Sequence, residues 1–508
     1  MKNDSISSLM VQTRMIDEKR QPYDYDPPDA SPIHPFLAQP FAARAKVLAT
    51  LFALLWCLAP DRLAWSGPPT EVATVAGFGQ VSVYAPRGTP SEVVLFVSGD
   101  GGWNLGVIPM AEALRDRGAL VVGIDVRQLV RTLNGADSCG YPAADLERLS
   151  RTVQLKRRVA AYKAPILLGY SSGATLVYAA VAAAPAETFA GAISLGFCPD
   201  LEISRPLCQQ NGLTLTRRAK GVGFALAPNH QMRTPWVALQ GETDQVCDAA
   251  ATRAFVAAVP GASFISLPNV GHGFAVTRNW VPQYLQAYDA LAAHHPSSAT
   301  LSTAAEVRDL ALEEVPVAPP ARPDTMAIIL TGDGGWADLD KHIAAGLAAR
   351  GIPAVGWSSL RYYWTPRTPD VAAADLTRII EHYMSHWGAQ RIILVGYSFG
   401  ADVLPFLVNR LPGALLPHVR AVALLGLSDA ADFEFHVSEW IGHRPSSPYR
   451  TVPEAERLSV PVLCVRGADE DDSACLRLKG PRISSREVGR GHHFSGDYVQ
   501  LVDAILKG

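Results

Sequence analysis

The sequence predicts an α/β protein made of two tandem domains, each built on a mostly parallel, doubly wound sheet. Three observations lead to this prediction. The chain has 508 residues, which is too long for one ordinary hydrophobic core. One segment occurs twice, and in both copies short apolar runs alternate with helical patterns.

The internal repeat is read directly from the letters. VVLFVSGDGGWNLGVIPMAEALRDRGALVVGID, from Val93, matches AIILTGDGGWADLDKHIAAGLAARGIPAVGWSS, from Ala327. Glycines pair at one constant offset across a strand, a turn, a helix and the next strand: Gly99 with Gly332, Gly118 with Gly351, and Gly123 with Gly356. A constant offset over this length indicates that the chain arose by duplication.

Each copy begins with a buried strand (Val93–Val97; Ala327–Leu330), followed by a Gly-rich turn and an amphipathic helix. A stretch rich in Ala, Pro, Ser and Thr then separates the copies and is typical of a linker. We therefore expect four parts: a leader over 1–66, a first domain over 67–292, a linker over 293–323 and a second domain over 324–508.

The N-terminal part resembles an export signal. The apolar run Val47–Ala59 follows two basic residues and is too short to span a bilayer comfortably. Small residues around Ser66 allow cleavage after it; the alternative is an uncleaved N-terminal anchor.

The cysteines also favour export. Removing Cys57 with the signal leaves an even set of six, of which Cys464 and Cys475 are the only possible pair in the second half. The four in the first half allow three pairings, and the sequence does not choose among them. This usage predicts an oxidising compartment.

Charge and spacing exclude several functions. A formal net charge of -3 offers no basic field for nucleic acid. The cysteines show no zinc or thioredoxin spacing, and the Gly-rich turns lack the G-K-[ST] ending of a nucleotide loop. We expect no metal and no cofactor, and the sequence leaves the oligomeric state open.

Each copy contains a G-x-S-x-G pentapeptide between a predicted strand and a predicted helix. The two read Gly169-Tyr170-Ser171-Ser172-Gly173 and Gly396-Tyr397-Ser398-Phe399-Gly400. Glycines beside the serine permit the sharp corner that exposes a nucleophilic Oγ above the sheet. Two such elbows, in register with the repeat, predict two α/β-hydrolase sites with Ser171 and Ser398 as nucleophiles.

A serine nucleophile needs a base and an orienting acid, which follow it in the order acid, then histidine. In the first half, Asp244 and His272 each follow a predicted strand. Carboxyl ends of parallel strands meet at one edge of a sheet, so we expect these groups to converge with Ser171.

In the second half we predict His492 as the base, with His493 as the alternative. The acid is ambiguous within Asp469–Asp472; aligning Cys475 with Cys247 favours Asp472, with Asp471 next.

Backbone N–H groups should stabilise the oxyanion. One donor is expected from the residue after each serine, Ser172 or Phe399. The other is expected from the Gly-rich turn, at Asp100-Gly101 in the first half and Asp333-Gly334 in the second. The tryptophans that end these turns, Trp103 and Trp336, are predicted to pack rather than to bind substrate.

At these residues the chain resembles the VirJ/AcvB family of bacterial exported virulence and acid-tolerance proteins. The resemblance covers most of the chain after the leader and is most specific in the second half. It rests there on TGDGGW from Thr331, SLRYYWTPRTP from Ser359, VGYSFGADVLPFL from Val395, LLGLSDAADFEFHVSEWIG from Leu424 and GHHFSGDY from Gly491.

The resemblance implies a periplasmic serine hydrolase that removes the aminoacyl group from lysyl- or alanyl-phosphatidylglycerol, with an acyl-enzyme on Ser398. Asp333 and Asp402 could hold the substrate's ammonium group. Phe433, Phe435, Trp440 and Ile441 could cover the site or touch lipid. The alternatives are another esterase, thioesterase or peptidase, or a non-catalytic scaffold for type IV secretion substrates.

Overall fold

The computed structural model describes residues 69–507, except 105, 137, 186, 294–305, 318–323 and 436–446. Ser66–Gly508 form one compact unit. The predicted leader and signal lie outside the described residues. Within the described part of the chain, no helix is long and apolar enough to cross a membrane.

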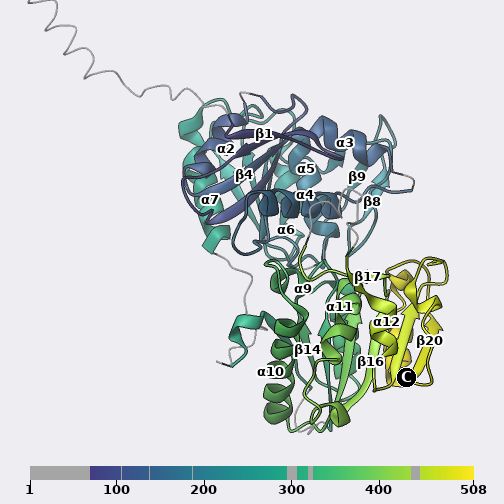
Figure 1. The fold of residues 1–508 in the computed structure, drawn as a ribbon. Helices are drawn as coiled ribbons and strands as arrows, with labels where there is room; N and C mark the ends of the chain where they lie inside the picture. The colour runs from purple at the N-terminus through teal and green to yellow at the C-terminus, as the bar shows by residue number, and fades with distance from the viewer. Residues whose placement is uncertain are drawn as a thin grey trace, which may run out of the picture. The chain divides into compact units, whose positions relative to one another are not determined.

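The first copy of the repeat forms a sheet with the strand order β1-β2-β4-β3-β5-β6-β10-β11 (Figure 1). Strands β1 and β2 are antiparallel to their neighbours and the others pair in parallel. The strands are β1 (Glu71–Val75), β2 (Gly79–Tyr84), β3 (Glu92–Val97), β4 (Ala119–Ile124), β5 (Ile166–Tyr170), β6 (Gly191–Leu195), β10 (Trp236–Gly241) and β11 (Ala262–Leu267).

Helices connect these strands and cover the sheet. They are α2 (Ile108–Arg115), α3 (Val126–Asn134), α4 (Pro142–Lys156), α5 (Ser172–Ala183), α6 (Ala249–Ala257) and α7 (Val281–Ala293). A small antiparallel sheet, β7 (Asp200–Leu201), β8 (Leu215–Arg217) and β9 (Phe224–Leu226), lies between β6 and β10 in the sequence.

The second copy repeats this topology with the order β12-β14-β13-β15-β16-β19-β20. Only β12 is antiparallel to its neighbour. The strands are β12 (Leu312–Val315), β13 (Thr325–Leu330), β14 (Ala354–Trp357), β15 (Arg391–Tyr397), β16 (Val419–Leu425), β19 (Val462–Arg466) and β20 (Ile483–Glu487). A short ribbon pairs β17 (Ala430–Ala431) with β18 (Tyr449–Arg450).

The helices of the second copy are α8 (Asp338–Ala348), α9 (Ser359–Tyr362), α10 (Pro369–Trp387), α11 (Phe399–Val408), α12 (Thr451–Glu456) and α13 (Tyr498–Lys507). They run from green to yellow in Figure 1. The doubly wound α/β fold expected from the alternating strands and helices is therefore confirmed in both copies.

Each sheet has a hydrophobic core on both faces because successive residues of a buried strand point to opposite sides. In β3, Val93 and Leu95 belong to one buried cluster, whereas Val94 and Phe96 belong to another. The second sheet divides its strand β13 in the same way. This two-sided burial explains why the predicted strands read as continuous apolar runs.

The segment predicted as a linker over 293–323 is not wholly a connection. A 3-10 helix, Arg308–Leu310, and the strand β12 lie inside it, and β12 pairs with β14 as the edge of the second sheet. The leucines of this stretch, Leu310 and Leu312, are buried in the second core. A strand of only four residues gave no clear signal within the Ala- and Pro-rich composition. The prediction that 293–323 is a linker throughout is therefore wrong for β12.

Candidate active sites

Both serines stand at sharp corners between a strand and a helix. Ser171 has φ 55° and ψ -123°, and Ser398 has φ 51° and ψ -116°. Such a conformation is costly for a residue with a side chain and is held by its surroundings. Each serine directly follows a central parallel strand and precedes the first residue of a helix, as the elbow pattern predicts.

The flanking glycines have a steric reason. A Cβ on Gly169 would lie 2.2 Å from the Gly173 carbonyl oxygen, and one on Gly173 would lie 2.3 Å from the Ser98 carbonyl oxygen. Gly396 and Gly400 are equally confined in the second copy. No side chain fits at these positions, so both elbows require glycine on each side of the serine.

In the first copy, the three residues predicted to act together lie in one chain of hydrogen bonds. Ser171 Oγ is 2.9 Å from His272 Nε2, and His272 Nδ1 is 2.8 Å from Asp244 Oδ2. The Asp244 side chain is fully buried, and its other oxygen accepts the backbone N–H groups of Val246 and Cys247. A buried, fully hydrogen-bonded carboxylate of this kind fixes the orientation of the imidazole.

The second copy has the same arrangement with a different acid. His492 Nε2 is 2.8 Å from Ser398 Oγ, and His492 Nδ1 is 2.6 Å from Glu470 Oε1. The second oxygen of Glu470 accepts the Gly467 backbone N–H at 2.7 Å. Both sites therefore place a serine, a histidine and a carboxylate in line, which is the geometry that general-base activation of a hydroxyl needs.

The prediction of Asp472, with Asp471 next, is wrong, because both side chains are exposed and Glu470 occupies the position beside His492. Aligning the cysteines misplaced the extra residues of this loop. Asp244 and Glu470 each stand three residues after a glycine at the end of a strand: Gly241 is the last residue of β10, and Gly467 directly follows β19. The two additional residues therefore follow the acid, and aligning Gly467 with Gly241, instead of the cysteines, leads to Glu470.

His493, the alternative base, faces a different group. Its Nδ1 is 3.0 Å from the Tyr397 hydroxyl, and burial lowers the pKa of its imidazole, helped by the neighbouring His492. The hydrogen bond to Ser398 comes from His492. The geometry thus agrees with the prediction of His492, and not His493, as the base.

Sequence reasoning missed the residues that support the two imidazoles. The elbow tyrosines donate to the backbone carbonyl of the histidine, Tyr170 to His272 at 2.9 Å and Tyr397 to His492 at 3.2 Å. Gly426 has φ 68°, and a Cβ there would lie 2.6 Å from His492 Cε1. The tyrosine that precedes the serine in both elbows is visible in the sequence and was the signal for these tyrosine–histidine hydrogen bonds.

The Gly-rich turns lie against the serines. A Cβ on Gly99 would be 3.1 Å from Ser171 Cβ, and one on Gly332 would be 3.5 Å from Ser398 Cβ. Ser172 and Phe399 are the first residues of α5 and α11, where helix N–H groups lack intrahelical partners. These positions are consistent with the predicted oxyanion donors. That backbone N–H groups of Ser172 and Phe399, and of the turns at Asp100-Gly101 and Asp333-Gly334, bind the oxyanion stays a prediction.

The tryptophans of the turns pack inside their own copy. A Cβ on Gly123 would lie 2.1 Å from the Trp103 ring, and one on Gly356 would lie 2.2 Å from the Trp336 ring. Trp103 also donates its indole N–H to Tyr84. Glycine is therefore required at this position of β4 and of β14, because any side chain there would overlap the indole ring.

Aromatic residues pack around Phe399, the residue after the second serine. Phe435 is buried and stacks on Phe399, with ring centroids 4.7 Å apart, and Phe433 is buried nearby. Trp440 and Ile441, which we also expected to cover the site, lie outside the described residues. The acidic candidates differ from each other: Asp333 is half exposed, whereas Asp402 is nearly buried and accepts the Ser428 backbone N–H.

Three disulfides tie the loops around these sites: Cys139–Cys208, Cys198–Cys247 and Cys464–Cys475. The last confirms the pairing predicted for the second half. Asp244, Cys247 and His272 have donor atoms within 4.8 Å of one another, but the Cys247 sulfur is bonded to Cys198 and is no thiolate ligand. Three disulfides are typical of proteins from an oxidising compartment.

A family model described as "Bacterial virulence protein (VirJ)" matches residues 91–194 and 324–508, more than half of the chain. The chain belongs to the VirJ family. The matched segments include Ser171 and all three residues of the second site, whereas Asp244 and His272 lie outside them. No curated protein sequence matches the chain.

Solved structures similar to the chain include serine hydrolases and esterases. An α/β serine hydrolase homologue from Coxiella burnetii is 20% identical and covers 45% of this chain and 98% of its own, with a TM-score of 0.29. An α/β serine hydrolase without a lid from Xanthomonas campestris is 21% identical over 45% and 97%, with a TM-score of 0.31. An esterase from Thermogutta terrifontis is 18% identical over 44% and 92%, with a TM-score of 0.32.

Proposed function

We propose that the protein is a periplasmic serine hydrolase that removes the aminoacyl group from lysyl- or alanyl-phosphatidylglycerol, and that the main reaction occurs at Ser398. The observation that carries the proposal is the line of hydrogen bonds from Ser398 through His492 to Glu470. Membership of the VirJ family supports placing the main reaction in the second copy, which the family model matches throughout.

The chemistry follows from these three side chains. Ser398 Oγ attacks the ester carbonyl carbon while His492 Nε2 takes the hydroxyl proton, and Glu470 stabilises the imidazolium. Backbone N–H groups of Phe399 and of the Gly-rich turn stabilise the oxyanion. The bond to the headgroup oxygen then breaks, and His492 returns its proton to the leaving phosphatidylglycerol.

Water completes the cycle. His492 removes a proton from a water molecule that attacks the aminoacyl-serine ester, and the proton then passes to Ser398 Oγ as the free amino acid leaves. The reaction needs no cofactor, because an α-ammonium group already activates the ester towards acyl transfer. Asp333 lies beside Gly334 in the turn; its carboxylate pairs with Arg151 on one side but stays half exposed, so it can also attract that ammonium group.

The first copy supports a second candidate function. Ser171, His272 and Asp244 form an equally complete line, with Asp244 fully buried. We propose that this copy is a second serine hydrolase site, with an acyl substrate that need not be the same.

The test uses the purified mature protein and vesicles of lysyl- or alanyl-phosphatidylglycerol, with release of free amino acid as the measurement. Ser398→Ala and Ser171→Ala are run beside the wild type, and vesicles of unmodified phosphatidylglycerol provide the blank. We expect Ser398→Ala to abolish release and Ser171→Ala to keep it. If no amino acid is released from either lipid, the proposed substrate is wrong. If only Ser171→Ala abolishes release, the main reaction takes place in the first copy.

A further inference from the structure

Helix α4 of the first copy borders the Gly-rich turn of the second copy. Arg151 of α4 pairs with Asp333 of that turn, with Nη1 3.5 Å from Oδ2, and it also pairs with Glu147 one helical turn away. A pocket of about 330 Å³ lies here, lined by α4 together with Asp333, Gly334 and His493. The pocket therefore adjoins the second active site.

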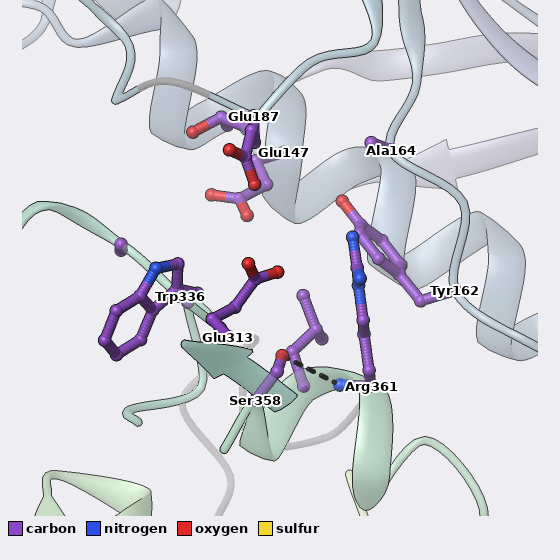
Figure 2. A pocket seen from close by; sticks show the side chains of 13 residues that line it. Glu147, Tyr162, Ala164, Glu187, Glu313, Trp336, Ser358 and Arg361 are labelled. Atoms are coloured by element: carbon purple, nitrogen blue, oxygen red, sulfur yellow. Dashed lines mark hydrogen bonds between the residues drawn. The ribbon is translucent and has the colours of Figure 1, made fainter. Parts of the chain in front are cut away.

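Further contacts join the loop that follows α4 to the second copy. The Trp364 indole donates to the Val159 carbonyl at 2.7 Å, and its ring contacts Tyr162 at 5.2 Å between centroids. Figure 2 shows a second, smaller pocket at this boundary, where Glu147 and Tyr162 face Trp336 and Arg361. First-copy side chains therefore line both pockets together with residues of the turn.

Arg151 is buried at this boundary, with 7% of its side chain exposed. Burial lowers the pKa of its guanidinium, but the nearby carboxylates of Glu147 and Asp333 more than offset this, so the pKa is raised and Arg151 stays charged. A buried charge is expensive to leave without its partners. Asp333 is therefore paired with a buried cation that Glu147 also holds.

The equivalent turn of the first copy is held from within. Gly102 lies against the guanidinium of Arg127 in the first turn of α3, and Arg127 pairs with Asp125, the N-cap residue of that helix. Hydrogen bonds from Arg127 and from the Trp103 backbone N–H lower the pKa of Asp125. A charged pair inside the first copy thus supports its own Gly-rich turn.

The second copy lacks an equivalent of the pair of Asp125 and Arg127. The repeat offset that aligns Gly102 with Gly335 places Ser358 opposite Asp125 and Leu360 opposite Arg127. Gly335 accordingly contacts the Ser358 hydroxyl and the Leu360 side chain. Both replacements are uncharged, so the second turn has no internal arginine at the position where the first turn has one.

We propose that Arg151 of the first copy replaces the missing internal arginine and is a positioning residue for the second active site. Through Asp333 it holds the Gly-rich turn where its N–H groups can meet the oxyanion formed on Ser398. The second site then depends on the first copy for its geometry, whereas the first site depends on its own Asp125 and Arg127. This dependence goes beyond the proposed substrate and requires only that both serines are nucleophiles.

The experiment uses the full mature chain and a fluorophosphonate probe, which phosphonylates serines activated by a base and an oxyanion hole. Peptide mass spectrometry follows Ser171 and Ser398 separately in the same molecules, so each site serves as a folding control for the other. The variants are Arg151→Met, Arg151→Lys, Asp333→Asn and the combination of Arg151→Met with Asp333→Asn. Arg148→Met is the matched control, because Arg148 lies on the same helix and pairs with Asp145.

We expect Arg151→Met to lower the maximal labelling rate of Ser398 about 10- to 100-fold, since displacing a catalytic donor by about 1 Å has effects of that size. The probe concentration at half-maximal rate should change little, and Ser171 should react at its normal rate. Arg151→Lys should recover part of the loss. Combining Arg151→Met with Asp333→Asn should add little to either change alone, because both remove one interaction.

Three outcomes would overturn the proposal: an unchanged Ser398 rate in Arg151→Met, an equal loss in Arg148→Met, or parallel losses at both serines. Parallel losses would indicate that Arg151 supports the fold as a whole. If Ser398 of the wild type does not react at all, the hydrolase assignment of the second copy fails as well. If it reacts but no aminoacyl lipid is cleaved, only the proposed substrate is lost.

Discussion

Replacing Glu470 by glutamine tests the identity of the second acid most directly. The glutamine side chain would keep an oxygen for the Gly467 N–H, so the loop should retain its shape. The new amide N–H would face His492 Nδ1, which favours the imidazole tautomer that carries its proton on Nε2. That tautomer cannot accept the proton of Ser398.

The expected loss is about 10³- to 10⁴-fold in kcat, since an amide at the acid position of a serine triad has an effect of that order. This corresponds to about 4 to 5.5 kcal/mol of transition-state stabilisation. KM should change much less, because Glu470 lies behind His492 and is separated by it from Ser398.

The assay is steady-state hydrolysis of a p-nitrophenyl ester by Glu470→Gln in a Ser171→Ala background, which silences the first site. Asp471→Asn and Asp472→Asn are matched controls, because both side chains are acidic, exposed and in the same loop. They should stay within about twofold of the parent, as surface substitutions usually do. A Glu470→Gln variant that is as active as these controls would refute the assignment.

Three further predictions concern other parts of the chain. Asp244→Asn should lower phosphonylation of Ser171 by about 10³-fold or more and leave the second site unchanged; a loss at both sites would contradict separate relays. Gly400→Ala should destabilise the protein by more than about 2 kcal/mol in urea unfolding, because its Cβ would lie 2.2 Å from a β13 carbonyl oxygen, whereas Gly413→Ala, in open space, should be near neutral. Asp125→Asn should lower stability at pH 7 but match the wild type once the pH falls well below about 4, because the stability that comes from a lowered carboxylate pKa is complete above the pKa of the unfolded chain and is lost as the pH falls through the pKa of the folded protein. A variant with the same loss of stability at pH 7 and at a pH of about 2 would show that the ionised carboxylate is not the cause.

Local rules were sufficient for much of the site. The elbows could be read from five letters because only glycine fits beside a serine whose φ is near +50°. His272 and His492 could be read because each follows a strand whose carboxyl end meets the elbow. The second acid could not be chosen in the same way, since the acidic loop holds four candidates and two alignments, on the glycine or on the cysteine, select different ones. Only the path of the backbone decides which carboxylate reaches the imidazole.

The sequence by itself determined the duplication, the α/β topology of each copy and the two nucleophilic serines. These depend on apolar periodicity and on steric limits that act within a few residues. The tertiary structure alone decided that Glu470 orients His492, that β12 joins the second sheet, and that Arg151 meets Asp333. Each of these is a contact between segments far apart in the chain, and its energy depends on distance and burial, which a sequence does not display.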